Sequence, residues 1–135
     1  MNRLFRPLNS LGLLLVWLTS FSHADPANLQ LLARSKTSMP SLTLDEGDRQ
    51  WLTNKGPLIL GTSAPDYAPF DISAGSDYFE GLTADYAGLL SQLLNVEIKV
   101  RRYDSRAEAI AALKTKEIDV LGTSNAYEMQ DPQLA

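Results

Sequence analysis

Two short segments of the sequence carry residues whose types suit the binding of a small polar molecule. The first contains Asp66, Tyr67 and Phe70, which together offer two aromatic faces beside a carboxylate. The second contains Thr123 and Ser124, whose hydroxyls and backbone amides both donate and accept hydrogen bonds. Aromatic walls with a few convergent polar groups are typical of a ligand-binding cleft, so we predict that these five residues contact a ligand.

The same residues also have a structural interpretation. Tyr67 and Phe70 are large aromatic side chains of a type that commonly packs on a hydrophobic core. Thr123 and Ser124 can hydrogen-bond the backbone of their own loop. The sequence leaves both interpretations open.

The composition excludes several kinds of chemistry. The chain has no cysteine, so it has neither a disulfide, nor a thiolate metal site, nor a cysteine nucleophile. Its single histidine, His23, lies in a segment that we expect to be removed. No two carboxylates are spaced convincingly for acid–base catalysis. We therefore expect this chain to be neither an enzyme nor a cofactor-binding protein.

The charge balance argues against a nucleic-acid partner. The 135 residues include 12 basic and 16 acidic side chains, a formal net charge of −4. No basic stripe is present that would neutralise phosphates. The pattern indicates a well-solvated globular surface, and the expected partner is a small polar solute.

The first residues, 1–24, are typical of a secretory signal peptide. Arg3 and Arg6 precede an apolar stretch from Leu8 to Leu18, and Ala24 completes a small-x-small cleavage site. The alternative, an uncleaved membrane anchor, is disfavoured because a spanning helix needs roughly 20 apolar residues. We predict export to the periplasm. The next residues, 25–41, are polar and lack clear periodicity, so they are predicted to be a linker.

The remaining residues, 42–135, predict strands that alternate with helices. Thr43 and Glu46 fit a capping box that begins a short helix, which Gly56 ends. Three strands are predicted at 58–62, 96–100 and 118–122 from apolar runs or strict alternation. A helix from residue 83 carries an apolar stripe, and another runs from a capping box at Ser105 through residue 114. The apolar stripe comprises Tyr86, Leu89, Leu90, Leu93 and Leu94, and in the later helix Ile110 and Leu113 are predicted to face inward.

This alternation predicts a parallel sheet with right-handed crossovers. In such sheets ligands bind beyond the carboxyl ends of the strands, which is where both polar segments fall. An open sheet of three parallel strands leaves its edges and faces poorly covered. We therefore expect residues 42–135 to be an incomplete lobe of a larger domain.

Several motifs occur in an order and spacing that are more specific than any one of them. They cover roughly Leu42 to Ala126 and comprise Leu42-Thr43-Leu44-Asp45-Glu46 with Trp51-Leu52, Pro57-Leu58-Ile59-Leu60-Gly61, Tyr67-Ala68-Pro69-Phe70, Phe79 to Tyr86, Ala107 to Leu113 and Lys116 to Val120. This arrangement resembles bacterial extracellular solute-binding protein family 3, whose members are periplasmic Venus-flytrap domains. The tryptophan-containing preamble resembles the modules of BvgS/EvgS-type hybrid sensor histidine kinases, with this sequence as an N-terminal fragment.

The resemblance implies an α/β fold, namely a partial periplasmic binding protein-like (type II) lobe with parallel strands and flanking helices. It implies that Tyr67 and Phe70 form an aromatic clamp and that Thr123 and Ser124 bind the ligand. Two positions depart from the family, because Asp131 stands where an arginine usually grips the ligand carboxylate and Glu128 stands where a threonine is usual. The departure implies either a ligand other than a standard amino acid or no ligand at all.

As a function, the resemblance implies a periplasmic solute-binding sensor domain that transmits lobe closure to a histidine kinase. One alternative is the substrate-binding component of an amino-acid ABC importer. Another is a solute-binding-like module of a periplasmic enzyme such as a lytic transglycosylase, although that reading needs a catalytic glutamate in a further domain. In each case we expect membrane contact only through a parent protein or a permease, and a parent kinase would allow dimerisation.

Overall fold

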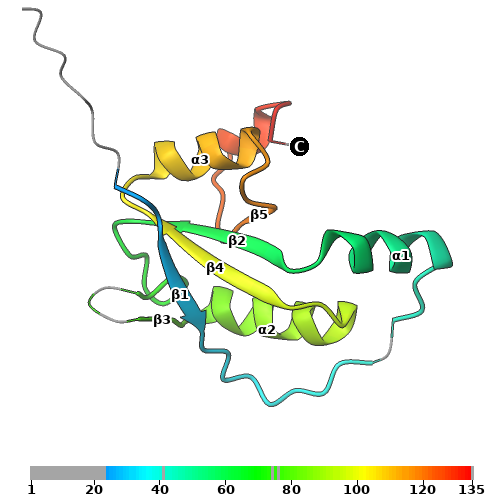
Figure 1. Cartoon of the computed structure of the whole chain (residues 1–135). Helices are drawn as coiled ribbons and strands as arrows, with labels where there is room; N and C mark the ends of the chain where they lie inside the picture. Colours follow the sequence, from blue (N-terminus) through cyan, green and yellow to red (C-terminus); the bar gives the residue numbers. More distant parts are fainter. Residues whose placement is uncertain (1–23, 41, 74, 76, 135) are drawn as a thin grey trace, which may run out of the picture.

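One mixed sheet organises the part of the chain that this computed structural model describes, residues 24–134 without 41, 74 and 76. The predicted signal peptide lies outside the described residues except for Ala24. The sheet has the strand order β3-β1-β4-β2-β5 (Figure 1). Its strands are β1 (Ala27–Leu31), β2 (Leu58–Ser63), β3 (Tyr78–Phe79), β4 (Ile98–Tyr103) and β5 (Val120–Leu121). The helices are α1 (Glu46–Lys55), α2 (Leu82–Leu94) and α3 (Arg106–Lys114), followed by the short 3₁₀ helix η1 (Glu128–Gln130).

The centre of the sheet has the predicted parallel arrangement. Strand β2 pairs in parallel with β4 on one side and with β5 on the other. Helix α2 connects β2 to β4, helix α3 connects β4 to β5, and the two helices lie on opposite faces of the sheet (Figure 1). After β2 the chain forms β4 on one side of β2, and it then crosses to form β5 on the other side. The connections therefore change direction at the boundary between β2 and β5. Ligands of open α/β sheets bind at such a point.

The N-terminal part of the described chain departs from the sequence prediction. Residues 25–41 were expected to be a linker, yet Ala27–Leu31 forms β1, which pairs antiparallel with β4 and parallel with β3. The physical reason is a short alternation, in which Leu29 and Leu31 are half-buried against the core while Asn28 and Gln30 are exposed. This period of two is the mark of a strand with one buried face.

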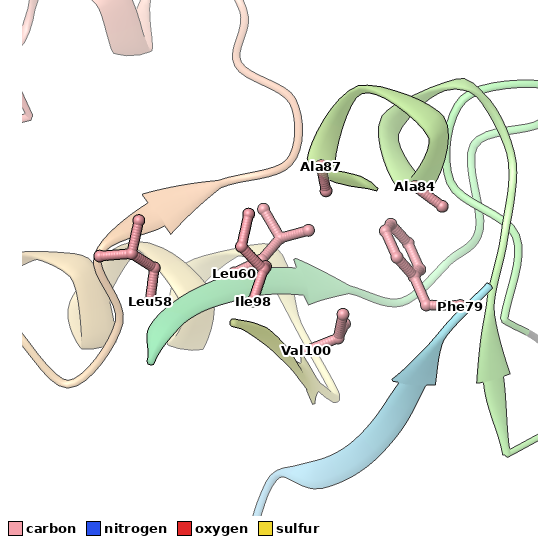
Figure 2. Close-up of a cluster of buried hydrophobic side chains, with 7 residues drawn as sticks. All are labelled: Leu58, Leu60, Phe79, Ala84, Ala87, Ile98 and Val100. Atoms are coloured by element: carbon pink, nitrogen blue, oxygen red, sulfur yellow. The ribbon is translucent and has the colours of Figure 1, made fainter. Parts of the chain in front are cut away.

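Helix α2 covers one face of the sheet through small side chains. Figure 2 shows Leu58, Leu60, Ile98 and Val100 of the sheet gathered beneath Ala84 and Ala87 of the helix, beside Phe79. The predicted apolar stripe is correct for Leu90 and Leu94, which pack on this cluster. It is wrong for Tyr86, which is 73% exposed. The contact runs through Ala84 and Ala87 instead, and the Tyr86 side chain stays outside the buried cluster.

Helix α3 packs on the opposite face. Its buried residues are Ala109 and Ala112, which meet Tyr103 and Ile118. Leu113, predicted to face inward, packs at the margin of this cluster, whereas Ile110 is only half-buried and lies outside it. Gly61 permits the close packing, because a Cβ there would lie 2.2 Å from Cδ1 of Ile118.

The helix ends test the two predicted capping boxes. Ser105 caps α3 as expected, since its hydroxyl accepts from the backbone N–H of Glu108 at 3.2 Å. For α1 the predicted cap is wrong, because Asp45 and not Thr43 precedes the helix, and its carboxylate accepts from Asp48 N at 2.8 Å. Within the described residues, no helix combines the length and the hydropathy needed to cross a membrane.

Candidate ligand-binding cleft

A cleft of about 360 Å³ lies where β2 and β5 end, at the switch point of the sheet. Parallel strands bring their carboxyl ends to one edge, so the loops after β2 and β5 and the start of α3 face the same space. The lining residues are Ser63, Ala64, Pro65, Tyr67 and Asp71 after β2, Arg106 at the start of α3, and Thr123, Ser124, Asn125 and Glu128 after β5.

The two predicted aromatic residues form one platform. The rings of Tyr67 and Phe70 stack with centroids 5.4 Å apart and an angle of 12° between their planes. Neither ring is buried, since Tyr67 is 63% exposed and Phe70 is 39% exposed. Tyr67 lines the cleft directly, and Phe70 supports it from outside the lining.

Asp66 serves the loop after β2 and does not line the cleft. Its carboxylate accepts hydrogen bonds from the backbone N–H of Ser73 at 2.6 Å and from the Ser73 hydroxyl at 2.9 Å. It also lies 3.6 Å from the guanidinium of Arg102. These contacts close the loop that carries Tyr67 and Phe70, and Asp66 therefore acts on the cleft through the shape of that loop.

Thr123 and Ser124 both line the cleft. The Thr123 hydroxyl donates to Oδ2 of Asp71 at 3.4 Å, so it links the loops after β2 and β5. Ser124 is exposed at the rim. The local capping role falls to Asn125, whose side-chain oxygen accepts from the backbone N–H groups of Tyr127 and Glu128, both at 3.0 Å.

Sequence reasoning missed the charged pair in the cleft. Nε of Arg106 donates to Oε1 of Glu128 at 2.9 Å, and NH2 donates to Oε2 at 2.5 Å. NH2 also donates to the carbonyl oxygen of Thr123, and Oε2 accepts from Asn125 N at 3.0 Å. The hydrogen bond from Arg106 lowers the pKa of Glu128 below its ordinary value, against an opposing effect of burial. Arg106 directly follows the Ser105 cap, and nothing in the sequence indicated that its side chain would contact the loop after β5.

Sequence reasoning also missed Asp71. Only 6% of this residue is exposed, and its backbone pairs with that of Tyr67 through hydrogen bonds of 2.9 and 3.0 Å. Within the described residues its Oδ1 has no hydrogen-bond partner. The sequence offered one signal for Asp71, namely its position directly after the Pro69-Phe70 pair of the aromatic motif. The surrounding region is rich in turn residues, so this acid was not distinguished from ordinary loop residues.

Asp131, which stands at the expected arginine position, lies away from the cleft lining. Its carboxylate pairs with Nζ of Lys114 at 2.8 Å, and this hydrogen bond lowers the pKa of Asp131 below its ordinary value. Glu128, at the expected threonine position, does line the cleft, but Arg106 neutralises it. The two acidic departures therefore have different structural consequences.

Parallel strands with a helix on each face, and a cleft at their carboxyl ends, are consistent with a periplasmic binding protein-like lobe of the Venus-flytrap class. The comparisons agree with this class. The chain is 40% identical over 117 residues to the virulence sensor protein BvgS of Bordetella parapertussis, which covers 85% of this chain and 9% of that protein. It is 25% identical over 108 residues to the sensor protein EvgS of Escherichia coli K12, over 78% of this chain and 9% of that protein.

The crystal structure of the Bordetella pertussis BvgS periplasmic domain matches with a TM-score of 0.68 and 39% sequence identity, over 77% of this chain and 20% of that chain. No protein-family model matches the chain. The chain is a homologue of the BvgS and EvgS sensor proteins, and it resembles a part of the BvgS periplasmic domain. It spans 9% of the length of these relatives.

Proposed function

We propose that this chain is a solute-sensing lobe in the periplasmic region of a BvgS-type sensor histidine kinase. A small polar solute binds in the cleft at the carboxyl ends of β2 and β5, and a second lobe closes over it. The chain itself acts by binding and not by catalysis. Its contact with the membrane runs through the parent protein, which also provides the means of dimerisation.

The cleft at the switch point is the observation that carries this proposal. Tyr67 and Asp71 come from the loop after β2, and Thr123 comes from the loop after β5, which is distant in sequence. The three residues share one open space of a size suited to a small solute. Closure can signal only if the solute binds the closed form more tightly than the open form. The cleft is open on one side, and the lining groups described here belong to a single lobe. A second lobe that closes over the solute would add further contacts, and these contacts would make the closed form bind more tightly.

Blocking the cleft tests this function. Ser124 is an exposed lining residue, so Ser124→Trp in the full-length protein would fill the cleft with little disturbance of the core. We expect a changed output from a reporter gene under the control of the sensor, with the variant present at wild-type abundance. Gln92→Trp, at an exposed position on α2 outside the cleft, is the matched control and should leave the output unchanged.

A panel of amino acids, amines and organic acids, screened by thermal shift on the full-length protein, would identify the solute. At least one compound should raise the melting temperature of the wild type and of Gln92→Trp but not of Ser124→Trp. The proposal is contradicted if Ser124→Trp signals like the wild type and no compound distinguishes the two variants.

A further inference from the structure

We propose that the cleft recognises a solute through a cationic N–H group, an ammonium or an amidinium, with Asp71 and Tyr67 as its partners. This inference rests on the proposed function and specifies the chemistry of its solute. Three features of the cleft support it: a guanidinium whose binding edges are occupied, a buried carboxylate with one oxygen that has no donor among the described residues, and an aromatic ring that lines the same cleft.

The first feature is the state of Arg106. A solute carboxylate binds arginine best as a fork, through two neighbouring N–H groups. Here the edge formed by Nε and NH2 is filled by Glu128, and the other hydrogen of NH2 is directed to the carbonyl oxygen of Thr123. Both forked edges include NH2, so neither is left for a solute anion. The cleft therefore contains an arginine but no site for bidentate binding of a carboxylate.

The second feature is the charge that remains. Arg106 and Glu128 neutralise each other, which leaves Asp71 as the remaining carboxylate among the described cleft-lining residues. Among the described residues, its Oδ2 accepts the long hydrogen bond from Thr123, and its Oδ1 has no partner. A buried carboxylate oxygen without a donor is costly, and an N–H donor that carries positive charge removes this cost. The terminal torsion of an aspartate is broad, so a small rotation presents either oxygen to the cleft.

The third feature is the aromatic ring of Tyr67, which lines the same cleft as this carboxylate. Two backbone hydrogen bonds tie Tyr67 to Asp71, and the stack on Phe70 fixes the orientation of the Tyr67 ring. A cation over an aromatic face within about 6 Å of the ring centre is attracted by the ring quadrupole. A carboxylate and an aromatic face on one wall of a cleft therefore favour the same kind of ligand.

Isothermal titration of the full-length protein with matched probes tests the inference. The probes are agmatine and putrescine as cations, 1,5-pentanediol as a neutral compound and glutarate as an anion. We expect the cations to bind and the neutral and anionic probes not to bind. Asp71→Asn keeps the shape of the side chain and removes its charge, and it should weaken cation binding by about tenfold or more. Asp131→Asn removes an acid outside the cleft and should have no effect.

Two further variants keep the test decisive if Asp71→Asn fails to fold. Tyr67→Ala, at an exposed position, should weaken cation binding. Glu128→Gln frees the charge of Arg106 and should allow glutarate to bind. Binding of glutarate and not of the cations to the wild type would overturn this inference and leave the proposed function intact. Failure of every probe, with Ser124→Trp altering the signal, would also overturn the inference alone. Loss of the Ser124→Trp effect would instead overturn the proposed function.

Discussion

At the scale of single residues, the contact between Arg106 and Glu128 determines the charge of the cleft. It joins the start of α3 to η1, and it also holds the backbone of Thr123. From the sequence, Glu128 and Asp131 stood out only as acids at positions where the family usually has a threonine and an arginine. The structure separates them, because Glu128 is neutralised inside the cleft and Asp131 pairs with Lys114 outside it.

The lowered pKa of Glu128 makes the stability of the protein depend on pH. A carboxyl group whose pKa is lower in the folded state stabilises the fold above its unfolded pKa, about 4.3 for glutamate, and this stabilisation is lost as the pH falls through the folded value. We expect Glu128→Gln to reduce the loss of stability below about pH 4.3, and to lower stability at neutral pH. Urea unfolding of the full-length protein across this pH range measures both effects.

Asp131→Asn provides the comparison for this measurement. Its carboxylate is also stabilised in the charged form, but by Lys114 in a partly solvent-exposed pair, which salt screens. The pH dependence should therefore change less than in Glu128→Gln, and its change should shrink further at high salt. Equal pH profiles for the wild type and Glu128→Gln would contradict the account of the Arg106–Glu128 contact.

At the scale of secondary-structure elements, α1 and α3 differ in how they are coupled to the core. Both begin with a side-chain cap, at Asp45 and Ser105. Helix α3 buries Ala109 and Ala112, whereas α1 buries no residue. We expect Ser105→Ala to lower the global free energy of unfolding by about 1 kcal/mol, because loss of the cap loosens a helix that covers the sheet.

Asp45→Ala is the matched control for Ser105→Ala. It should increase hydrogen exchange at the start of α1 with a smaller effect on global unfolding, because a helix without buried residues can fray locally. Chemical denaturation and amide exchange of the two variants separate the outcomes. Equal global losses would mean that α1 is coupled to the core more tightly than its burial indicates.

The elements that could be predicted are those whose pattern is long and self-consistent. Strands β2 and β4 and helices α2 and α3 follow from apolar runs, periodicity and the Ser105 cap. Strand β1 was missed because its alternation spans only five residues, and β3 because its two residues lie in a turn-rich region. In the cleft, Tyr67, Thr123 and Ser124 were located by their position after strands. Asp71 and Arg106 were not, and Glu128 was noted only as a departure from the family, because the contacts of these residues depend on how the loops and α3 pack together.

At the scale of the whole molecule, one face and one edge of this lobe are incompletely covered. A groove of about 140 Å³ runs along α2 beside β5, and it is bordered by the exposed side chains of Tyr86 and Val120. Strand β5 has only two residues and pairs with β2 on one side. Exposed apolar grooves and open strand edges are normally covered by other parts of a protein.

This incomplete cover predicts the behaviour of residues 25–135 as an isolated polypeptide. We expect broad thermal melting with low cooperativity, because the buried clusters are small and rely on several alanines. Differential scanning calorimetry compares the calorimetric and van't Hoff enthalpies. A sharp transition in which the two enthalpies agree would show that the lobe folds independently.

The position of β1 determines where a reporter can be attached to this protein. Ala27–Leu31 lies between β3 and β4 within the sheet, so a fluorescent domain fused directly ahead of it would crowd two neighbouring strands. The exposed stretch from Lys36 to Met39, between β1 and α1, offers an insertion site without this conflict. Labelling there would leave the sheet, and therefore the cleft at its carboxyl edge, undisturbed for optical recording of lobe movement.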